Sequence, residues 1–461
     1  MALPCPAPTP TEAAIATAWR AECGRIVAAV TRITHDLGLA EECAQDALLA
    51  ALAHWPAHGV PDNPAAWLTT TAKRRALDHL RHHQVMAREH AALGADLDAR
   101  QAAVVPDFVD ALDAARADTI GDDPLRLMLI ACHPVLPLDG RVALTLRLLG
   151  GLSTAEIARA CLTTETTMAQ RIVRAKKTLA SAGVPFELPR GPALAERLGA
   201  VQEVVYLVFN EGYSASQGDD LMRPALCNEA LRLGRLLAEL TPDAPEALGL
   251  LALMELQASR SAARCDAHGE PVLLPAQDRS RWDAAQIQRG LSALAKAEAL
   301  ARHHQAGWGP YQLQAAIAAC HSRATSAADT DWPRIARLYT ALAHALPSPV
   351  VALNRAVAVG MADGPAAGLA LVEDLASDPQ LQRYPWLHSA HADLLARLGR
   401  HTEAGQAWLR AAALTGNHRE QAWLSARAAA CAETTNGAEA PLTEPGLPQQ
   451  PVASPRGFEP L

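Results

Sequence analysis

The sequence of 461 residues has few aromatic side chains and no long apolar run. Aromatic residues make up 4% of the chain while alanine and leucine dominate, which favours helices throughout. No stretch of 18 or more apolar residues occurs, so the sequence predicts no membrane-spanning helix. The proline-rich start, residues 2–10, lacks the basic and apolar regions of a signal peptide. We therefore expect a cytoplasmic protein that binds no membrane.

The cysteines and histidines form no ligand motif. The 9 cysteines are scattered singly without a C-x-x-C pair, which argues against a disulfide framework and against a zinc knuckle. The 17 histidines include no H-E-x-x-H or related spacing, so we expect no metal and no cofactor. Two polar segments, 210–216 and 278–283, suggest no pairing of a nucleophile with a base, so we expect no enzymatic activity.

Charge is distributed unevenly along the chain. The net charge is -8, yet residues 124–190 carry 9 basic and 4 acidic side chains, while residues 84–123 carry 3 basic and 9 acidic ones. An acidic protein is a poor nonspecific ligand for duplex DNA, because that affinity comes mostly from cations released when phosphates are neutralised. Any DNA binding is therefore expected to be local and assisted by a partner.

Residues 152–177 read as two helices joined by a tight turn. Ser153 and Glu156 have the spacing of a capping box, and Thr163 or Thr164 can cap the second helix. The second helix has an apolar stripe at helical spacing, formed by Met168, Ile172, Ala175 and Leu179.

This layout is that of a helix-turn-helix that enters a major groove of DNA. Basic residues on a helix face are also common on ordinary solvated surfaces, so the pattern alone leaves that alternative open. The candidates for contact with DNA lie away from the apolar stripe: Thr166, Thr167, Gln170, Arg171, Arg174 and Lys177.

Three upstream segments, 33–47, 60–68 and 72–81, complete a pattern with the helix-turn-helix. With its Trp-Leu pair and its Lys-Arg-Arg-Ala-Leu-Asp string, the chain resembles a bacterial RNA polymerase sigma factor of the extracytoplasmic-function (ECF) group. The resemblance implies that an acidic helix binds the core polymerase; without it, the acidic residues would be read as a solvated face. The implied core-binding residues are Asp36, Leu37, Glu41, Glu42, Gln45 and Asp46.

The same resemblance implies that residues 63–81 melt and read the promoter −10 element. Asn63 or Asp62 can cap a helix that begins at Pro64. Cations suit the backbone of single-stranded DNA and an aromatic ring suits an unstacked base, although for Trp67 a core aromatic residue is the favoured interpretation. The implied −10 residues are Asn63, Trp67, Lys73, Arg74, Arg75 and Arg81, and the implied −35 residues are the helix-turn-helix candidates.

Segments 206–216, 278–283, 309–319 and 326–332 resemble the C-terminal extension of one ECF subgroup, which carries a tetratricopeptide-like (TPR-like) region thought to control activity. Segments 352–371 and 390–407 repeat an alanine-rich helix, a glycine-containing turn and a second helix; helices are also expected at 194–209, 226–240, 288–303, 310–322 and 332–346. Residues 209–216 either contact a ligand or partner, or cap a helix with a left-handed glycine and tie the extension to the rest; the candidates are Asn210, Glu211, Gly212, Tyr213 and Ser214.

The expected fold is all-α, with two small sigma domains, an acidic linker and a helical-repeat C-terminal domain. The linker is either a plain spacer or a segment that threads the polymerase channel, as the resemblance implies. The expected divisions are 12–83 (core and −10), 84–123 (linker), 124–188 (−35), 190–286 (connecting), 287–431 (repeats) and 432–461 (disordered tail).

Two functions compete at this stage. The favoured one is a sigma factor that binds core RNA polymerase and promoter DNA and aids initiation, with a regulatory protein or ligand acting on its extension. The alternative is a free-standing helix-turn-helix regulator whose repeat domain senses a ligand or partner. A sigma factor needs core polymerase to bind promoters strongly, whereas a regulator binds duplex DNA by itself.

Overall fold

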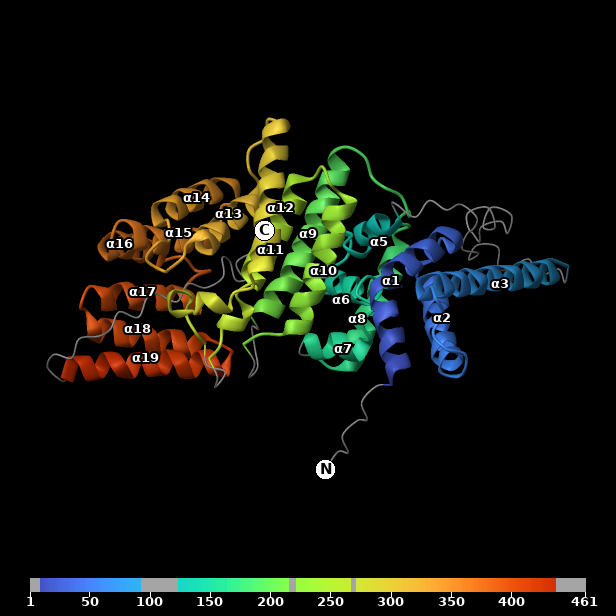
Figure 1. The fold of residues 1–461 in the computed structure, drawn as a ribbon, viewed down its shortest axis with the longest axis horizontal. Helices are drawn as coiled ribbons and strands as arrows, with labels where there is room; N and C mark the ends of the chain where they lie inside the picture. The colour runs from blue at the N-terminus through green and yellow to red at the C-terminus, as the bar shows by residue number, and fades with distance from the viewer. Residues whose placement is uncertain (1–8, 93–122, 162, 215–220, 267–270, 437–461) are drawn as a thin grey trace, which may run out of the picture. The chain divides into compact units, whose positions relative to one another are not determined.

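The computed structural model describes residues 9–92, 123–161, 163–214, 221–266 and 271–436. Within these ranges the chain is all-α, with short 3-10 helices and no strand beyond one isolated bridge, as the sequence predicted (Figure 1). The chain divides into two compact units, residues 1–204 and 205–461. None of the described helices is long and apolar enough to cross a membrane.

The first unit begins with three helices that pack together, α1 (Pro10–Thr34), α2 (Leu37–His58) and α3 (Pro64–Ala92). The Asp36 carboxylate caps α2 by accepting the Leu39 N–H at 3.0 Å, and Asn63 accepts the Ala66 N–H at the start of α3. The fully buried side chains of this bundle include Ile15, Ile26, Ile33, Trp55 and Leu68.

The helix-turn-helix domain follows in the same unit, formed by α5 (Asp123–Ala131), α6 (Leu138–Leu148), α7 (Thr154–Ala160) and α8 (Glu165–Ser181). The expected capping box is present, because Ser153 and Glu156 bond each other's backbone N–H. Thr164 caps α8 by accepting the Thr167 N–H. The expected apolar stripe of α8 is also buried: Met168, Ile172, Ala175 and Leu179.

The predicted linker 84–123 differs from the structure at both ends. Helix α3 continues past residue 83 to Ala92, so the first part of the linker is helical. At the other end, Asp123 begins α5 and is only 2% exposed. The acidic residues between, at positions 93–122, lie outside the described residues.

Helix α9 (Pro192–Tyr213) contains the boundary between the two units. The second unit continues with α10 (Pro224–Leu240), α11 (Pro245–Ala258), α12 (Ala284–His303) and α13 (Pro310–Arg323). Short 3-10 helices, η1 (Ser261–Ala263), η2 (Leu274–Ala276) and η3 (Arg279–Arg281), lie between α11 and α12. Helix α11 is central, since it packs on α10, α12 and α13 and is buried almost all round.

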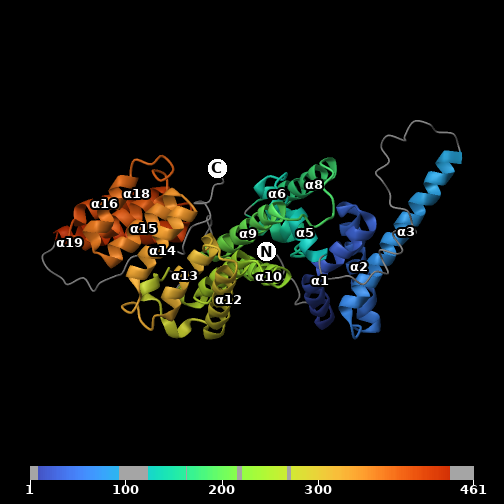
Figure 2. The ribbon, with the colours of Figure 1, turned by 90° about the horizontal axis from the view of Figure 1, so that it is seen from above.

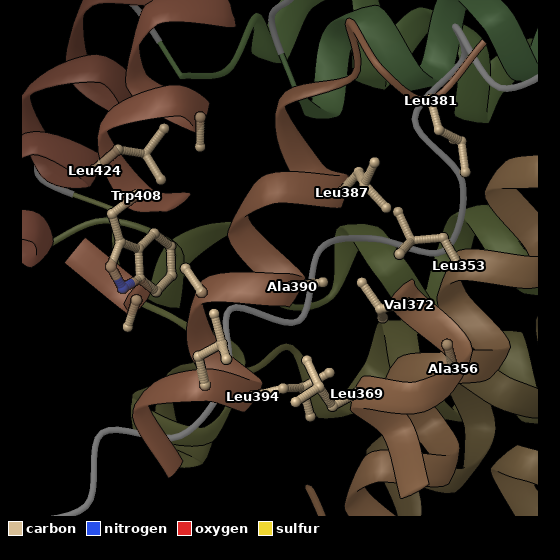
Figure 3. Close-up of a cluster of buried hydrophobic side chains, with 14 of the residues drawn as sticks. Leu353, Ala356, Leu369, Val372, Leu381, Leu387, Ala390, Leu394, Trp408 and Leu424 are labelled. Atoms are coloured by element: carbon tan, nitrogen blue, oxygen red, sulfur yellow. The ribbon is translucent and has the colours of Figure 1, made fainter. Parts of the chain in front are cut away.

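Six further helices follow: α14 (Trp332–Ala345), α15 (Pro349–Ala362), α16 (Pro365–Leu375), α17 (Pro385–Arg397), α18 (His401–Leu414) and α19 (His418–Asn436). Each packs on the next along the chain, and they lie together in orange to red in Figure 2. Several begin with proline, which suits the first helical turn because the N–H it lacks would have no partner there. Helices α15 to α19 share a core that contains Leu353, Leu369, Val372, Leu387, Leu394 and Trp408 (Figure 3).

Glycines set the closest helix approaches of the second unit. The sequence suggested that Gly212 ends a helix in a left-handed conformation. Gly212 instead lies inside α9 and has no positive φ. A Cβ at this position would overlap the backbone nitrogen of Cys227 in α10, so this glycine serves close packing instead. Similarly, a Cβ on Gly368 of α16 would lie 2.6 Å from the Cα of Gly360 in α15.

The C-terminal boundary also differs from expectation. Helix α19 continues to Asn436, so residues 432–436 are helical although the sequence predicted disorder from residue 432. The remainder of the predicted tail lies outside the described residues.

Candidate polymerase and promoter interface

Helix α8 presents a polar face opposite its buried stripe. Gln170, Arg174 and Lys177 are exposed on this face, together with Thr166 in the first turn. Two of the predicted −35 residues are partly engaged within the domain. Thr167 shares a hydroxyl contact of 2.8 Å with its N-cap threonine, and Arg171 lies 3.3 Å from the Asp139 carboxylate in α6. The helix therefore displays donors and cations at the spacing that a groove-reading helix needs.

The predicted −10 residues lie along the first half of α3. Asn63 is exposed but its side chain serves as the helix cap. Trp67 is half-buried and meets Trp55 edge to face, with ring centroids 5.5 Å apart, so it is in part the core aromatic residue that the sequence left as an alternative. The basic cluster lies one turn and more further on: Lys73 is half-buried, whereas Arg74, Arg75 and Arg81 are exposed.

The predicted core-binding residues of α2 fall into two groups. Glu42 and Asp46 are exposed, and Leu37 and Gln45 are half-buried. Asp36 is exposed too, with its carboxylate occupied as the cap of α2. Glu41 is different, because its side chain is only 8% exposed.

Glu41 lies in an ion-pair cluster with the helix-turn-helix domain. Its Oε1 accepts from Arg147 Nε of α6 at 2.7 Å, and its Oε2 pairs with Lys176 Nζ of α8. The Arg147 and Lys176 side chains are 19% and 26% exposed, so the three charges are largely removed from water. A carboxylate with two cationic partners in such a site is strongly held, since losing one ion pair of a largely buried carboxylate is costly even when the other pair remains.

Further contacts between α1 and the helix-turn-helix domain surround this cluster. The Trp19 indole N–H donates to the Gly151 carbonyl at 3.1 Å. Gly151 has a φ of +63°, and a Cβ there would come within 3.0 Å of the indole nitrogen, so the turn before α7 needs glycine. Two ion pairs also link them: Arg20 with Glu156 at 3.0 Å and Arg32 with Asp123 at 3.4 Å. The two domains of the first unit are thus joined by ion pairs as well as by the packing of α1 on α5 and α6.

Sequence reasoning missed Trp19, Arg147 and Lys176, which make this joint. No local pattern distinguishes Arg147 from other basic residues, and Lys176 stands beside Lys177 in the same helix. Only the contacts of Glu41 in α2 and Trp19 in α1 with the helix-turn-helix domain show their role.

The residues at the end of α9 make contacts within the second unit. Glu211 pairs with Arg223 at 2.6 Å, and Tyr213 stacks on Phe209 beneath the guanidinium of Arg264, which lies 3.9 Å above the ring. Asn210 is 2% exposed, and Ser214 donates its N–H to the Asn210 carbonyl at 2.8 Å. These residues tie α9 to its neighbours. Residues 215 and 216 of the predicted segment lie outside the described ranges.

Comparisons with known proteins place the chain. Residues 19–85 match Sigma-70 region 2, residues 126–179 match Sigma-70 region 4, and residues 197–298 match a family of unknown function, DUF6596. The chain is 46% identical over 400 residues to the uncharacterized protein R00370 of Rhizobium meliloti (strain 1021), covering 86% of this chain and 90% of that protein. No solved structure matches.

The chain therefore belongs to the sigma-70 family. Within that family it is an ECF-like sigma factor with a C-terminal extension. Its region 2 and region 4 domains are those of a protein that binds core RNA polymerase, recognises promoters and initiates transcription. Sigma-70 families act as transcription factors rather than as enzymes.

Proposed function

We propose that this chain is a sigma factor of the ECF group. It binds core polymerase through α2 and contacts the −10 element through α3 and the −35 element through α8. The observation that carries the promoter assignment is the two-sided character of α8. Its apolar stripe is buried, and Thr166, Gln170, Arg174 and Lys177 are exposed on the other side. Such a helix can enter a groove without disturbing its own core.

The Glu41 cluster supports a second element of the proposal, which is that the two sigma domains separate when the chain binds core polymerase. In the family, the α2 surface contacts the polymerase, yet Glu41 is covered here by α6 and α8. Glu42 and Asp46 remain exposed and offer the first contact. Core polymerase then competes with Arg147 and Lys176 for Glu41.

A regulatory role of the extension is the third element. The six consecutive helices α14 to α19, each packed on the next, support a TPR-like array, because repeat domains of this kind present extended surfaces to partners. Regulation then acts through a partner or ligand of this array.

In vitro transcription tests the assignment directly. The full chain and a chain ending at Arg190, before α9 begins, are each combined with core polymerase on a library of genomic promoters. We expect initiation from at least one promoter, with the truncated chain differing in its level. If neither form directs initiation anywhere, the sigma assignment fails; equal levels from both forms contradict a regulatory extension.

Charge reversal tests the −35 surface. Arg174→Glu combined with Lys177→Glu is expected to weaken upstream-element binding by the holoenzyme and to reduce its salt dependence, since each lost phosphate contact lowers the log-log slope by about 1. Arg190→Glu, an exposed reversal beyond the end of α8, is the matched control and should leave binding unchanged. Core association should stay intact in all three proteins. A normal footprint in the double variant would refute the α8 assignment.

A further inference from the structure

The second unit contains a cavity of about 770 Å³. Its wall is built from η2 and η3, the end of α13, the segment that leads into α14 with its first residue, the facing ends of α15 and α16, and helices α17 to α19. Pockets of roughly 300–1,000 Å³ are typical of sites for small organic ligands. This volume therefore suits a ligand larger than an inorganic ion.

The cavity lining carries an excess of positive charge. Arg279, Arg397 and Arg427 line it, and Asp393 is the one carboxylate in the lining. Burial and the nearby guanidiniums of Arg260 and Arg279 lower the pKa of His321, a further lining residue, to about 3, so this imidazole is neutral near pH 7. The arginines thus outnumber the acid, and the cavity favours an anion.

Arg397 and Arg427 each have guanidinium N–H donors that make no hydrogen bond to the described residues. Arg427 approaches Asp393 Oδ1 only to 3.7 Å, and its side chain makes no hydrogen bond among the described residues. Arg397 is exposed, and its one hydrogen bond there runs to the Met361 sulfur at 3.1 Å. A guanidinium has five N–H donors in a planar fork that matches a carboxylate or a phosphate. Donors on both arginines are therefore available to a ligand.

Asp393 positions this part of the lining. Its residue is 2% exposed and its Oδ2 has no hydrogen-bond partner among the described residues. A buried carboxylate beside Arg427 holds the arginine near the cavity without consuming its donors, because the 3.7 Å contact is longer than a hydrogen bond. Arg427 also lies 5.3 Å from the ring centre of Trp408, which packs in the array core (Figure 3).

Much of the rest of the lining is apolar and aromatic, with Thr330, His401 and Thr434 as further polar residues. Trp332 and Trp408 contribute rings, and Met361, Pro365 and Leu274 contribute aliphatic surface. An aromatic or aliphatic part of a ligand that packs on these side chains is stabilised by about 25 cal/mol for each Å² of apolar surface removed from water. The lining thus combines cationic groups that can bind an anion with apolar side chains that can pack against the rest of a ligand.

We propose that this cavity binds a small organic anion whose carboxylate or phosphate group is held by Arg397 and Arg427 and whose apolar or aromatic body lies against Trp332 and Trp408. The site belongs to the extension and is independent of the DNA-binding surfaces. It deepens the proposed regulatory role by giving the class of ligand, but binding and transcription are measured separately, so either can fail alone.

Titration of the full chain with three naphthalene probes tests the proposal. 1-Naphthoate supplies a carboxylate, 1-naphthyl phosphate supplies a phosphate, and 1-naphthalenemethanol has the same ring without charge. Calorimetry is expected to give sub-millimolar binding for at least one anion and binding at least about tenfold weaker for the alcohol, a difference of about 1.4 kcal/mol. Whichever anion binds more tightly identifies the anionic group. Equal binding of all three probes, or none, overturns the proposal.

Variants locate the binding. Arg397→Gln removes an exposed guanidinium and should weaken anion binding about tenfold without changing the unfolding midpoint, a loss typical of a charge-assisted hydrogen bond. Arg427→Lys keeps a positive charge but removes the planar fork, and should weaken binding as well. Arg337→Gln, an exposed arginine of α14 outside the lining, is the control and should bind as the parent chain does. Unchanged binding in both cavity variants places the probe elsewhere and contradicts the proposal.

Discussion

The two units of this sigma factor hold their helices together by different means. In the first unit, the joint between the two sigma domains includes ion pairs from Glu41, Arg20 and Arg32. In the second unit, glycines let helices approach until backbone meets backbone, as at Gly212 and Gly368. Charged contacts can be exchanged for contacts with a partner, whereas close steric packing cannot be exchanged. We therefore propose that the charged contacts of the first unit separate more readily than the glycine contacts of the second unit.

The largest expected effect comes from disrupting the close helix contact at Gly212 in the second unit. Gly212→Ala places a methyl group against the backbone of Cys227 and should destabilise the second unit by about 3 kcal/mol, the upper end for an overpacked core. Gly199→Ala in the same helix meets no atom within 4 Å and should stabilise the chain by about 0.5–1 kcal/mol, as alanine does in a helix. Urea unfolding of the two variants measures this. Equal effects of the same sign would show that steric packing at Gly212 is not the cause.

The next effect acts on the charged joint. Lys176→Gln removes one of the two cations that hold Glu41 and should weaken the joint by about 2 kcal/mol, somewhat less than for a fully buried pair. Because we propose that the closed arrangement competes with core polymerase, the variant should bind core more tightly, by about 30-fold. Lys177→Gln, the neighbouring exposed lysine, is the control.

Fluorescence anisotropy of labelled sigma factor titrated with core polymerase provides this measurement. Weaker core binding by Lys176→Gln, with normal binding by Lys177→Gln, would mean that Lys176 itself assists the polymerase. That outcome would contradict the competition at Glu41.

The smallest effect concerns acid stability of the second unit. Burial lowers the folded-state pKa of His321 to about 3, whereas its ordinary value is 6.5. Between these values the unfolded chain binds the additional proton, so His321 favours folding above pH 6.5 and this contribution is lost as the pH falls toward 3. Relative to His321→Gln, the parent chain should lose about 1 kcal/mol of unfolding free energy between pH 6.5 and pH 5.5.

Asp393 makes the comparison with a variant necessary. Burial raises its pKa to about 6, which has the opposite effect on stability in an overlapping range of pH, and it is present in both proteins. Urea midpoints measured at matched pH values therefore isolate His321. Parallel curves for the two proteins would show that His321 is not held neutral.

Local signals predicted much of the first unit. The capping box at Ser153, the cap at Thr164 and the stripe along α8 depend on residues a few positions apart, and all three are present. The expected helices of the second unit are present for the same reason. Helix α11 was not predicted individually, because it is apolar on nearly every side and shows no helical periodicity.

Contacts between residues far apart in the sequence could not be predicted from these local patterns. Gly212 was misread because its requirement for a small residue comes from Cys227 in another helix. The burial of Glu41 depends on two cations more than one hundred positions away in the chain. The cavity in the extension unites residues from 274 to 434, a grouping that only the folded array creates.

The Glu41 cluster has a quantitative consequence for how the cell's polymerase pool is shared. If core binding requires the proposed separation of the two sigma domains, the free energy that holds them together is subtracted from the affinity for core enzyme. Each 1.4 kcal/mol of it then raises the core concentration needed for half-occupancy about tenfold. Under this proposal the joint sets a threshold: at low core supply this sigma factor loses core to competitors, and a modest weakening of the ion pairs of Glu41 changes that balance.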